Sequence, residues 1–175
     1  AEFPIDKNDF SVTVNGSKIN FDVVFNAIHG TPGEDGLMQA YFELLNIPQT
    51  SCDYYQAALT FNKRDMLSVL KPYGIRTAES YYLNLGDEIN VETILAKVGL
   101  PCFVKPNKSG SSFGISKVKT REEFLPAIEN AYKEDDEIII ESFLDGTEVS
   151  VGVINYKGTV IVLPITEIVS ENDFF

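Results

Sequence analysis

The fold is decided by the stretch Val104-Lys105-Pro106-Asn107-Lys108-Ser109-Gly110-Ser111-Ser112-Phe113-Gly114. The apolar run before it, residues 100–104, predicts a short buried strand that delivers a lysine and stops at a proline. The Gly-, Ser- and Lys-rich loop that follows can present backbone N–H groups, hydroxyls and an ammonium to a polyanion. Because the chain as a whole is acidic, this local cationic loop indicates a specific phosphate site and not a diffuse electrostatic surface.

The composition is that of a globular protein, and it excludes several functional classes. The chain has 175 residues, of which 44% are apolar and 23% are charged, enough for one sizeable core or two small units. Its net charge of −12 argues against DNA or RNA as a main partner, although a nucleotide needs only a few well-placed cations. No apolar run reaches the ~18 residues that span a bilayer and no N-terminal signal is evident, so we expect no membrane association and a cytoplasmic location.

The cysteines and the chain ends give two further expectations. Cys52 and Cys102 form no metal-binding pattern, and we expect reduced structural thiols. The chain opens on Ala1-Glu2-Phe3 and closes on Phe174-Phe175. Such apolar ends suggest a piece of a longer protein, because exposed aromatic termini are uncommon in a complete domain.

The first third of the chain predicts two strands joined by a tight turn and then a third, buried strand. Asn15-Gly16 separates two alternating runs, residues 11–14 and 18–25, and Asn-Gly in this position is a strong hairpin signal. Residues 21–28 are almost continuously apolar, so we expect a buried strand there.

A glycine-rich loop and a helix follow that strand. The loop is His29-Gly30-Thr31-Pro32-Gly33-Glu34-Asp35-Gly36, and residues 37–46 have helical periodicity with Asp35 as the expected N-cap. This order places the loop at the carboxyl end of a strand, where α/β folds bind ligands.

The remaining sequence predicts an α+β unit and then the beginning of an antiparallel sheet. A helix is expected over residues 54–70, in two pieces with the break near Lys63 and a stop at Gly74. Thr120 and Glu123 form a capping box for a helix over residues 121–132. The other expected elements are a helix at 91–98 ended by Gly99, and strands at 75–83, 102–105, 115–118, 137–143, 148–155 and 159–168.

Lys105 and the serines after it are the first candidates for ligand binding. A lysine in an apolar strand is costly to bury without an anionic partner, although a lysine at a strand end can also extend to water. Ser109, Ser111 and Ser112 fit a flexible lid over phosphates between two glycines, or simply a turn. The loop is not a Walker loop, because no Gly-Lys-Ser/Thr ends it.

A histidine and several carboxylates are the next candidates. His29 is the only histidine and opens the glycine-rich loop, where small residues permit close approach of a substrate; the alternative is a hydrogen-bonded structural residue. Glu34 and Asp35 also fit the acidic start of a helix. Glu141 and Glu148 are either solvent-facing strand residues or acceptors for an adenine amino group and ribose hydroxyls.

Taken together, these motifs resemble the D-alanine–D-alanine ligases of the ATP-grasp superfamily, in the family's order and spacing from about residue 21 onward. The matching motifs are His29-Gly30-x-x-Gly33-Glu34-Asp35-Gly36, Asn62-Lys63, Phe103-Val104-Lys105-Pro106, Gly110-Ser111-Ser112-x-Gly114, and Ile140-Glu141 followed by Gly146-x-Glu148. The first of these loops is specific to this ligase branch, whereas lysine-proline followed by a serine-glycine lid is shared more widely.

The resemblance implies a reaction and a set of site residues. The reaction is ATP-dependent joining of two D-alanines through an acyl phosphate, for peptidoglycan, the cell wall and cell shape. Lys63 and Lys105 are implied to contact the ATP phosphates, with Lys105 also near adenine. Ser111 and Ser112 are implied to lie in the lid over the phosphates, and Ser111 also to join a hydrogen-bond network on the substrate side. Glu141 is implied to bind the adenine amino group, with Ser142, Phe143 and Leu144 beside it, and Glu148 to bind the ribose. Phe174 is implied to pack near adenine, and His29 to orient the second D-alanine.

The resemblance also implies a fold and a set of missing parts. The expected fold combines α/β and α+β units: a partial ATP-grasp fold preceded by part of a Rossmann-like N-terminal domain. The expected domains are a partial substrate-side domain at 1–51, a central ATP-grasp subdomain at 52–140 and the beginning of a C-terminal subdomain at 141–175. The family's first strand and glycine-rich loop are expected before Ala1. Its Mg²⁺ ligands, transition-state arginine and lysine-tyrosine loop are expected beyond Phe175, so we expect the chain alone to be inactive.

Two other functions remain compatible with the motifs. One is a different ATP-grasp carboxylate–amine ligase, against which the His29 loop argues. The other is a non-catalytic nucleotide-binding domain that kept the ATP-grasp core, which would also lack the metal cluster. The expected partners are ATP and D-alanine, with a homodimer as the common assembly of the family.

Overall fold

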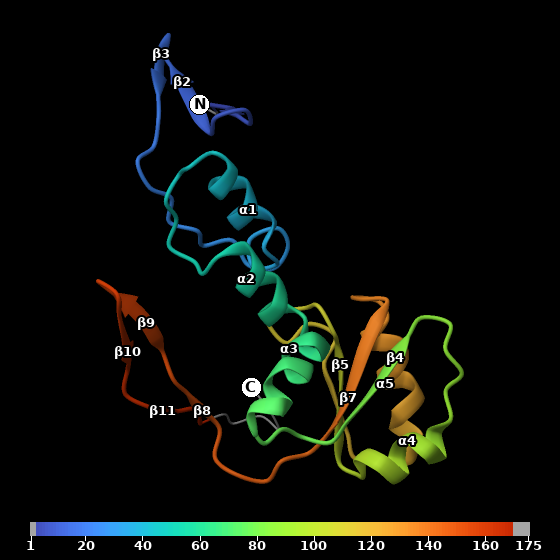
Figure 1. Cartoon of the computed structure of the whole chain (residues 1–175). Coiled ribbons are helices and arrows are strands. Elements are labelled where there is room, and N and C mark those ends of the chain that lie inside the picture. The colour runs from blue at the N-terminus through green and yellow to red at the C-terminus, as the bar shows by residue number, and fades with distance from the viewer. Residues whose placement is uncertain (1–2, 170–175) are drawn as a thin grey trace. The chain divides into compact units, whose positions relative to one another are not determined.

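The computed structural model describes residues 3–169, which divide into two compact units (Figure 1). The first unit runs to Thr77 and includes the loop Asn107–Phe113, and the second comprises Ala78–Pro106 and continues from Gly114. None of the helices within residues 3–169 combines the length and the apolar character that crossing a bilayer requires.

The first unit begins with an antiparallel sheet in the order β1-β2-β3. Its strands are β1 (Ile5–Asp6), β2 (Ser11–Val14) and β3 (Ser17–Ile19). Asn15 and Gly16 have φ angles of 49° and 79°, the left-handed pair that a two-residue hairpin turn needs. The predicted hairpin is therefore confirmed, although its second strand ends at Ile19 and does not continue to residue 25.

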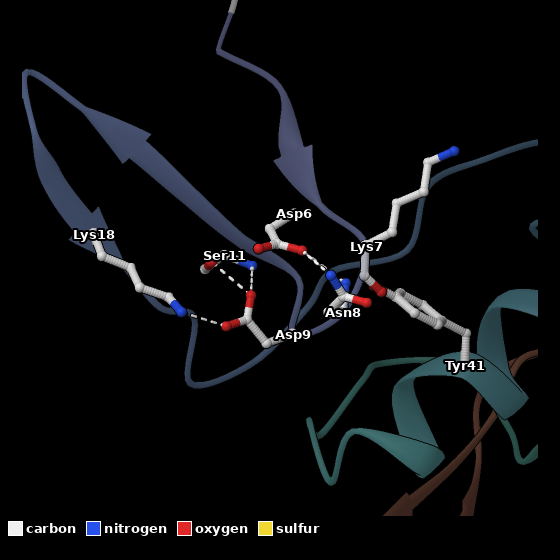
Figure 2. Close-up of polar contacts among 7 residues, drawn as sticks. All are labelled: Asp6, Lys7, Asn8, Asp9, Ser11, Lys18 and Tyr41. Atoms are coloured by element: carbon white, nitrogen blue, oxygen red, sulfur yellow. Dashed lines mark hydrogen bonds and ion pairs between the residues drawn. The ribbon is translucent and has the colours of Figure 1, made fainter.

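A polar cluster at the base of this hairpin is shown in Figure 2. The Lys18 ammonium donates to the Asp9 carboxylate, which also accepts from the hydroxyl and the backbone N–H of Ser11. These hydrogen bonds, led by the one from Lys18, lower the pKa of Asp9 from 3.8 to about 2. Nearby, the Tyr41 hydroxyl donates to the Lys7 carbonyl at 2.7 Å, and the Phe10 ring lies 4.9 Å from the Phe42 ring, so the hairpin is attached to the helix that follows.

Helices follow the hairpin in the first unit. They are α1 (Leu37–Leu44), α2 (Tyr54–Phe61), α3 (Lys63–Leu70) and the 3₁₀ turn η1 (Lys71–Tyr73). The break between α2 and α3 at Asn62 and the stop at Gly74 agree with the sequence prediction.

The expected cap of α1 is wrong by one residue. Gly36, with φ of 93°, occupies the N-cap position, and the Asp35 carboxylate accepts from the Leu37 N–H at 3.1 Å from the position before it. A side chain at residue 36 is excluded because a Cβ there would lie 2.5 Å from the Tyr54 carbonyl oxygen. The helix also ends at Leu44, two residues before the predicted end.

The expected buried strand at 21–28 is wrong within the described residues. Its one β-bridge joins Val24 to Gln49 in parallel, with the Val24 N–H donating to Pro48 O at 2.9 Å. Phe25 is 79% exposed and Val23 is 60% exposed. An apolar run becomes a buried strand only when neighbouring strands and helices cover it, and the described residues pair with it at this bridge alone.

The second unit contains a four-stranded antiparallel sheet in the order β4-β7-β5-β6. Its strands are β4 (Ser80–Asn84), β5 (Cys102–Pro106), β6 (Ser116–Val118) and β7 (Glu137–Ser142). The strand predicted at 75–83 begins only at Ser80. Two antiparallel strand pairs follow. β9 (Val153–Tyr156) pairs with β10 (Thr159–Val162) across the turn Lys157-Gly158, and β8 (Val149–Ser150) pairs with β11 (Thr166–Glu167).

One face of this sheet packs against two helices, α4 (Val91–Val98) and α5 (Phe124–Ala131). The 3₁₀ turn η2 (Arg121–Glu123) precedes α5, and the predicted Thr120–Glu123 capping box is present. The core residues are apolar and come from alternate strand positions and from the inner faces of the helices; they include Val104, Val118, Ile138, Ile140, Ile94, Phe124 and Ile128. The intervening strand residues therefore point to the opposite face.

We predict that Asp9 titrates well below the ordinary pKa of an aspartate. Since its pKa in the folded chain is about 2, the ionised group stabilises the hairpin above about pH 4, and this stabilisation is lost as the pH falls toward 2. A carboxyl NMR titration measures this pKa directly. Lys18→Met should raise it only part of the way, because both Ser11 donors remain; an Asp9 pKa near 4 in the unmodified chain would contradict the contacts in Figure 2.

We predict that the two thiols differ sharply in reactivity. Cys102 lies in the sheet core, where burial raises its pKa to about 11, whereas Cys52 is exposed. A thiol reagent at pH 8 should therefore modify Cys52 at once and Cys102 only after denaturant is added. Equal rates in the native chain would show that Cys102 is accessible.

Candidate functional site

The face of the β4-β7-β5-β6 sheet away from α4 and α5 carries a charged pair. In the register of β5 and β7, Phe103 lies opposite Glu141 and Lys105 lies opposite Ile139, so Lys105 and Glu141 are diagonal neighbours. The Lys105 Nζ is 2.8 Å from the Glu141 Oε2, and both side chains are partly buried. The strand lysine and the strand glutamate singled out in the sequence therefore lie together on one surface.

An aromatic pair lies beside these charges. The Phe103 and Phe143 ring centroids are 6.2 Å apart, and the Lys105 ammonium lies 5.2 Å from the Phe103 centroid. Lys117 on β6 is opposite Phe103, and its ammonium lies 4.6 Å from the Phe143 centroid. Sequence reasoning missed Lys117; the alternation of the short strand 115–118 was the available signal. Flat apolar rings flanked by ammonium groups and a carboxylate suit a planar heterocycle with a polyanionic tail.

The other residues predicted near adenine and ribose follow Glu141 along the chain. The Ser142 hydroxyl accepts from the Glu79 N–H at 3.1 Å, which joins the end of β7 to the residue before β4. Leu144 and Glu148 are exposed on the segment after β7. Phe174 lies outside the described residues.

In the first unit, Asn107 joins the glycine-serine loop to the start of α3. The first backbone N–H groups of this helix have no partner within the helix. The Asn107 carbonyl accepts from the Lys63 N–H at 3.2 Å, and its side-chain oxygen accepts from the Arg64 N–H at 2.9 Å. Its amide donates to Asn62 Oδ1 at 2.9 Å, and Asn62 accepts from the Asp65 N–H. Asn107 is 1% exposed, and sequence reasoning gave it no role.

Lys63 holds the same loop from its side chain. Its ammonium donates to the carbonyl of Ser109 at 2.8 Å and to that of Asn107 at 3.3 Å. This contact brings the predicted phosphate ligand Lys63 to the predicted lid, within one unit.

The lid has an unusual backbone. Ser111 and Ser112 have φ angles of 50° and 59°, so two consecutive residues with side chains adopt the left-handed conformation. Residues other than glycine are rarely found there, and such strain concentrates at ligand-binding loops. The Phe113 N–H closes the turn by donating to the Gly110 carbonyl at 3.2 Å.

The His29 loop borders a cavity of about 580 Å³ in the first unit. His29 and Glu34 line this cavity, together with Asn26, Gln39, Ser51 and Phe61. The Glu34 carboxylate accepts from the Gly30 N–H at 2.6 Å, so its observed contact closes the loop. The predicted substrate-side residue therefore lies on a hollow surface.

Within residues 3–169, no three His, Cys, Asp or Glu side chains come together in a group that could hold a metal ion. The described residues therefore offer no ligand cluster to which a magnesium site is assigned.

We predict that Asn107→Ala destabilises the chain by about 1–3 kcal/mol, because it removes the side-chain partner of the part-buried Arg64 N–H and one partner of Asn62. Urea denaturation measures the change. Asn90→Ala is a matched control that removes the N-cap of α4 alone and should cost about 1 kcal/mol. If Asn107→Ala proved milder than Asn90→Ala, Asn107 would not have the role described here.

Two family models match the chain. "D-ala D-ala ligase N-terminus" matches residues 5–52, and "D-ala D-ala ligase C-terminus" matches residues 69–175. The second match alone covers more than half of the chain. It includes the strand lysine, the serine-glycine loop and Glu141.

A curated relative and two solved structures agree with this assignment. A D-alanine–D-alanine ligase from Flavobacterium johnsoniae is 82% identical over the whole chain, which covers 54% of that relative. The crystal structure of D-alanyl-alanine synthetase A from Vibrio cholerae has a TM-score of 0.86 at 25% identity, with 98% of this chain and 52% of that one covered. The VanG D-Ala:D-Ser ligase from Enterococcus faecalis has a TM-score of 0.82 at 32% identity, with 99% and 51% covered.

The chain thus spans about half the length of the curated relatives that it matches. The structural matches also confirm the predicted fold class, a mixed helix and strand architecture of the ATP-grasp type. Together, the motifs, the sheet face and the family models establish that this chain belongs to the D-alanine–D-alanine ligase family.

Proposed function

We propose that this chain supplies nucleotide-binding and substrate-side elements of a ligase that joins two D-alanines at the expense of ATP. The observation that carries the proposal is the Lys105–Glu141 pair beside the Phe103 and Phe143 rings on one sheet face. Membership of the family supports the choice of D-alanine. The product is a precursor of peptidoglycan, which links the enzyme to cell-wall synthesis and cell shape.

The reaction has two steps. The carboxylate of the first D-alanine attacks the γ-phosphorus of ATP, which forms D-alanyl phosphate and releases ADP. The amino group of the second D-alanine then attacks the acyl carbon, and phosphate leaves. Both steps concentrate negative charge, so preplaced ammonium and N–H groups lower the barrier.

The residues of this chain take defined parts in the proposal. Glu141 accepts from the adenine amino group, next to Ser142, Phe143 and Leu144, and Glu148 holds the ribose. Lys105 neutralises phosphate charge from a position that its contact with Glu141 fixes. Lys63, Ser111 and Ser112 act on the phosphates through the loop that Lys63 holds, with Ser111 also reaching toward the substrate. His29 orients the second D-alanine from the edge of the cavity, and Phe174 packs near adenine.

The proposal extends to features outside the described residues. Magnesium supplies further charge neutralisation when bound, and we assign its oxygen ligands to parts of the ligase other than residues 3–169.

The proposal also keeps the predicted domains at 1–51, 52–140 and 141–175. We also place the enzyme in the cytoplasm and expect a homodimer.

D-serine is the alternative second substrate. The VanG protein is named as a D-Ala:D-Ser ligase and has the same fold at 32% identity. The fold therefore does not select the second amino acid. Competition between D-alanine and D-serine in the assay below separates the two specificities.

We predict that Lys105→Ala weakens the use of ATP. The assay uses a chimera in which this chain replaces the matching 175 residues of the Flavobacterium johnsoniae ligase. The unmodified chimera should make D-alanyl-D-alanine. Loss of a charge-assisted contact to phosphate costs about 1.5–3 kcal/mol, so the KM for ATP should rise by about ten- to a hundredfold.

Lys97→Ala is the matched control. The Lys97 ammonium lies 5.6 Å from the Tyr81 ring centroid, on the helix side of the same sheet, so this substitution removes an equal charge away from the proposed site. Its KM for ATP should stay within about twofold, because the charge is remote. An inactive chimera beside an active parent enzyme, or equal effects of the two substitutions, would contradict the proposal.

Calorimetry on the chain alone should show weak ATP binding that Lys105→Ala abolishes. The chain alone should form no dipeptide.

A further inference from the structure

We propose that Asn26 and Gln39 are positioning residues that hold the His29 loop at a single atom, the Gly33 carbonyl oxygen. This inference rests on the proposed function, in which His29 orients the second D-alanine. In that setting, the two amides act on the substrate through the loop.

The Gly33 carbonyl oxygen receives two side-chain hydrogen bonds. Asn26 Nδ2 donates to it at 2.8 Å, and Gln39 Nε2 donates to it at 2.7 Å. The two donors come from different segments, because Asn26 precedes the loop and Gln39 lies on α1. Both amides also lie within hydrogen-bond distance of the Ser51 hydroxyl, at 3.3 Å and 3.5 Å. The loop is therefore clamped between two separate elements.

In addition to these two bonds, hydrogen bonds within the loop close it on itself. The N–H groups of Gly33 and Glu34 both donate to the Gly30 carbonyl, at 2.8 Å and 2.9 Å, and the Gly30 N–H donates back to the Glu34 carboxylate. Gly33 also packs against Ile28, where a Cβ would lie 2.4 Å from the carbonyl oxygen. Such a loop moves as one piece, so fixing its Gly33 carbonyl fixes the position of His29 as well.

The buried Gln39 side chain carries a cost to stability. It is 3% exposed, and its Oε1 has no hydrogen-bond partner among the described residues. A buried acceptor without a partner is destabilising, and an apolar side chain of similar shape avoids that cost. The surroundings explain the orientation of this amide: Nε2 meets two acceptors, and the reversed orientation would place Oε1 against the Gly33 carbonyl.

The test is Gln39→Met in the chimera described above. Methionine keeps the length of the side chain and removes both the donor and the acceptor without a partner. The KM for the second D-alanine should rise about tenfold, while kcat and the KM for ATP stay within about threefold, since the interaction fixes substrate geometry and not the nucleotide. The melting temperature should change little, because one destabilising group leaves together with one hydrogen bond. Gln56→Met, an exposed change on α2, is the matched control and should alter neither KM.

Asn26→Asp tests the second donor independently. The aspartate keeps the oxygen that accepts from the Ile28 N–H at 3.2 Å but replaces the donor to Gly33 with a second oxygen. We expect the same selective rise in the KM for D-alanine. An active chimera in which both substitutions leave this KM unchanged would overturn the inference. An inactive unmodified chimera would overturn the proposed function.

Hydrogen exchange tests the clamp without catalysis, so its result does not depend on the proposed function. Hydrogen exchange in this chain should be about tenfold faster at the Gly33 and Glu34 amides in Gln39→Met, because the loop loses one of the two side-chain hydrogen bonds to its Gly33 carbonyl. The amides of α4 in the second unit serve as the internal reference. Unchanged exchange in the loop would also overturn the clamp.

Discussion

The register between β5 and β7 is the constraint on which the candidate nucleotide face depends. Pairing of Phe103 with Glu141 sends Val104 and Ile140 into the core against the helices and places Lys105 beside Glu141 on the other face. A slip of one residue in either strand would turn the charged residue of that strand toward the core and its apolar residues outward. The apolar packing therefore fixes the position of a charged pair that contributes little to that packing.

The first unit depends on polar contacts to a greater degree. In its described part, Phe42 and Ala57 are the buried apolar side chains, whereas Ser11, Gln39 and Asn107 are buried polar ones. Side-chain amides fix the two loops that carry candidate site residues: Gln39 donates to the Gly33 carbonyl of the His29 loop, and Asn107 accepts from the Arg64 N–H at the start of α3. Such bonds are directional, so they define one loop geometry where dispersion forces alone would permit several.

Local chemistry made much of the fold predictable from sequence. The Asn15-Gly16 turn, the Thr120–Glu123 capping box and the stop of α4 at Gly99 each depend on neighbouring residues, and each is confirmed. The prediction of a buried strand at 21–28 was wrong because burial depends on covering strands and helices that the run itself does not specify. The Lys105 motif pointed to the sheet face, but Lys117, Asn107 and Gln39 were missed, because their partners are distant in sequence or are backbone atoms that no motif displays.

The division of the chain at Pro106 and Gly114 has a consequence for the order in which the molecule assembles. The loop Asn107–Phe113 belongs to the unit that starts the chain, although β4, α4 and β5 are synthesised before it. A nascent chain that stops before Asn107 has no partner from this loop for the Arg64 N–H, and β4 cannot pair with β7 until Glu141 has emerged. The first unit therefore cannot complete its folding before the loop between β5 and β6 has been synthesised, and by then β4, α4 and β5 of the second unit have also been made.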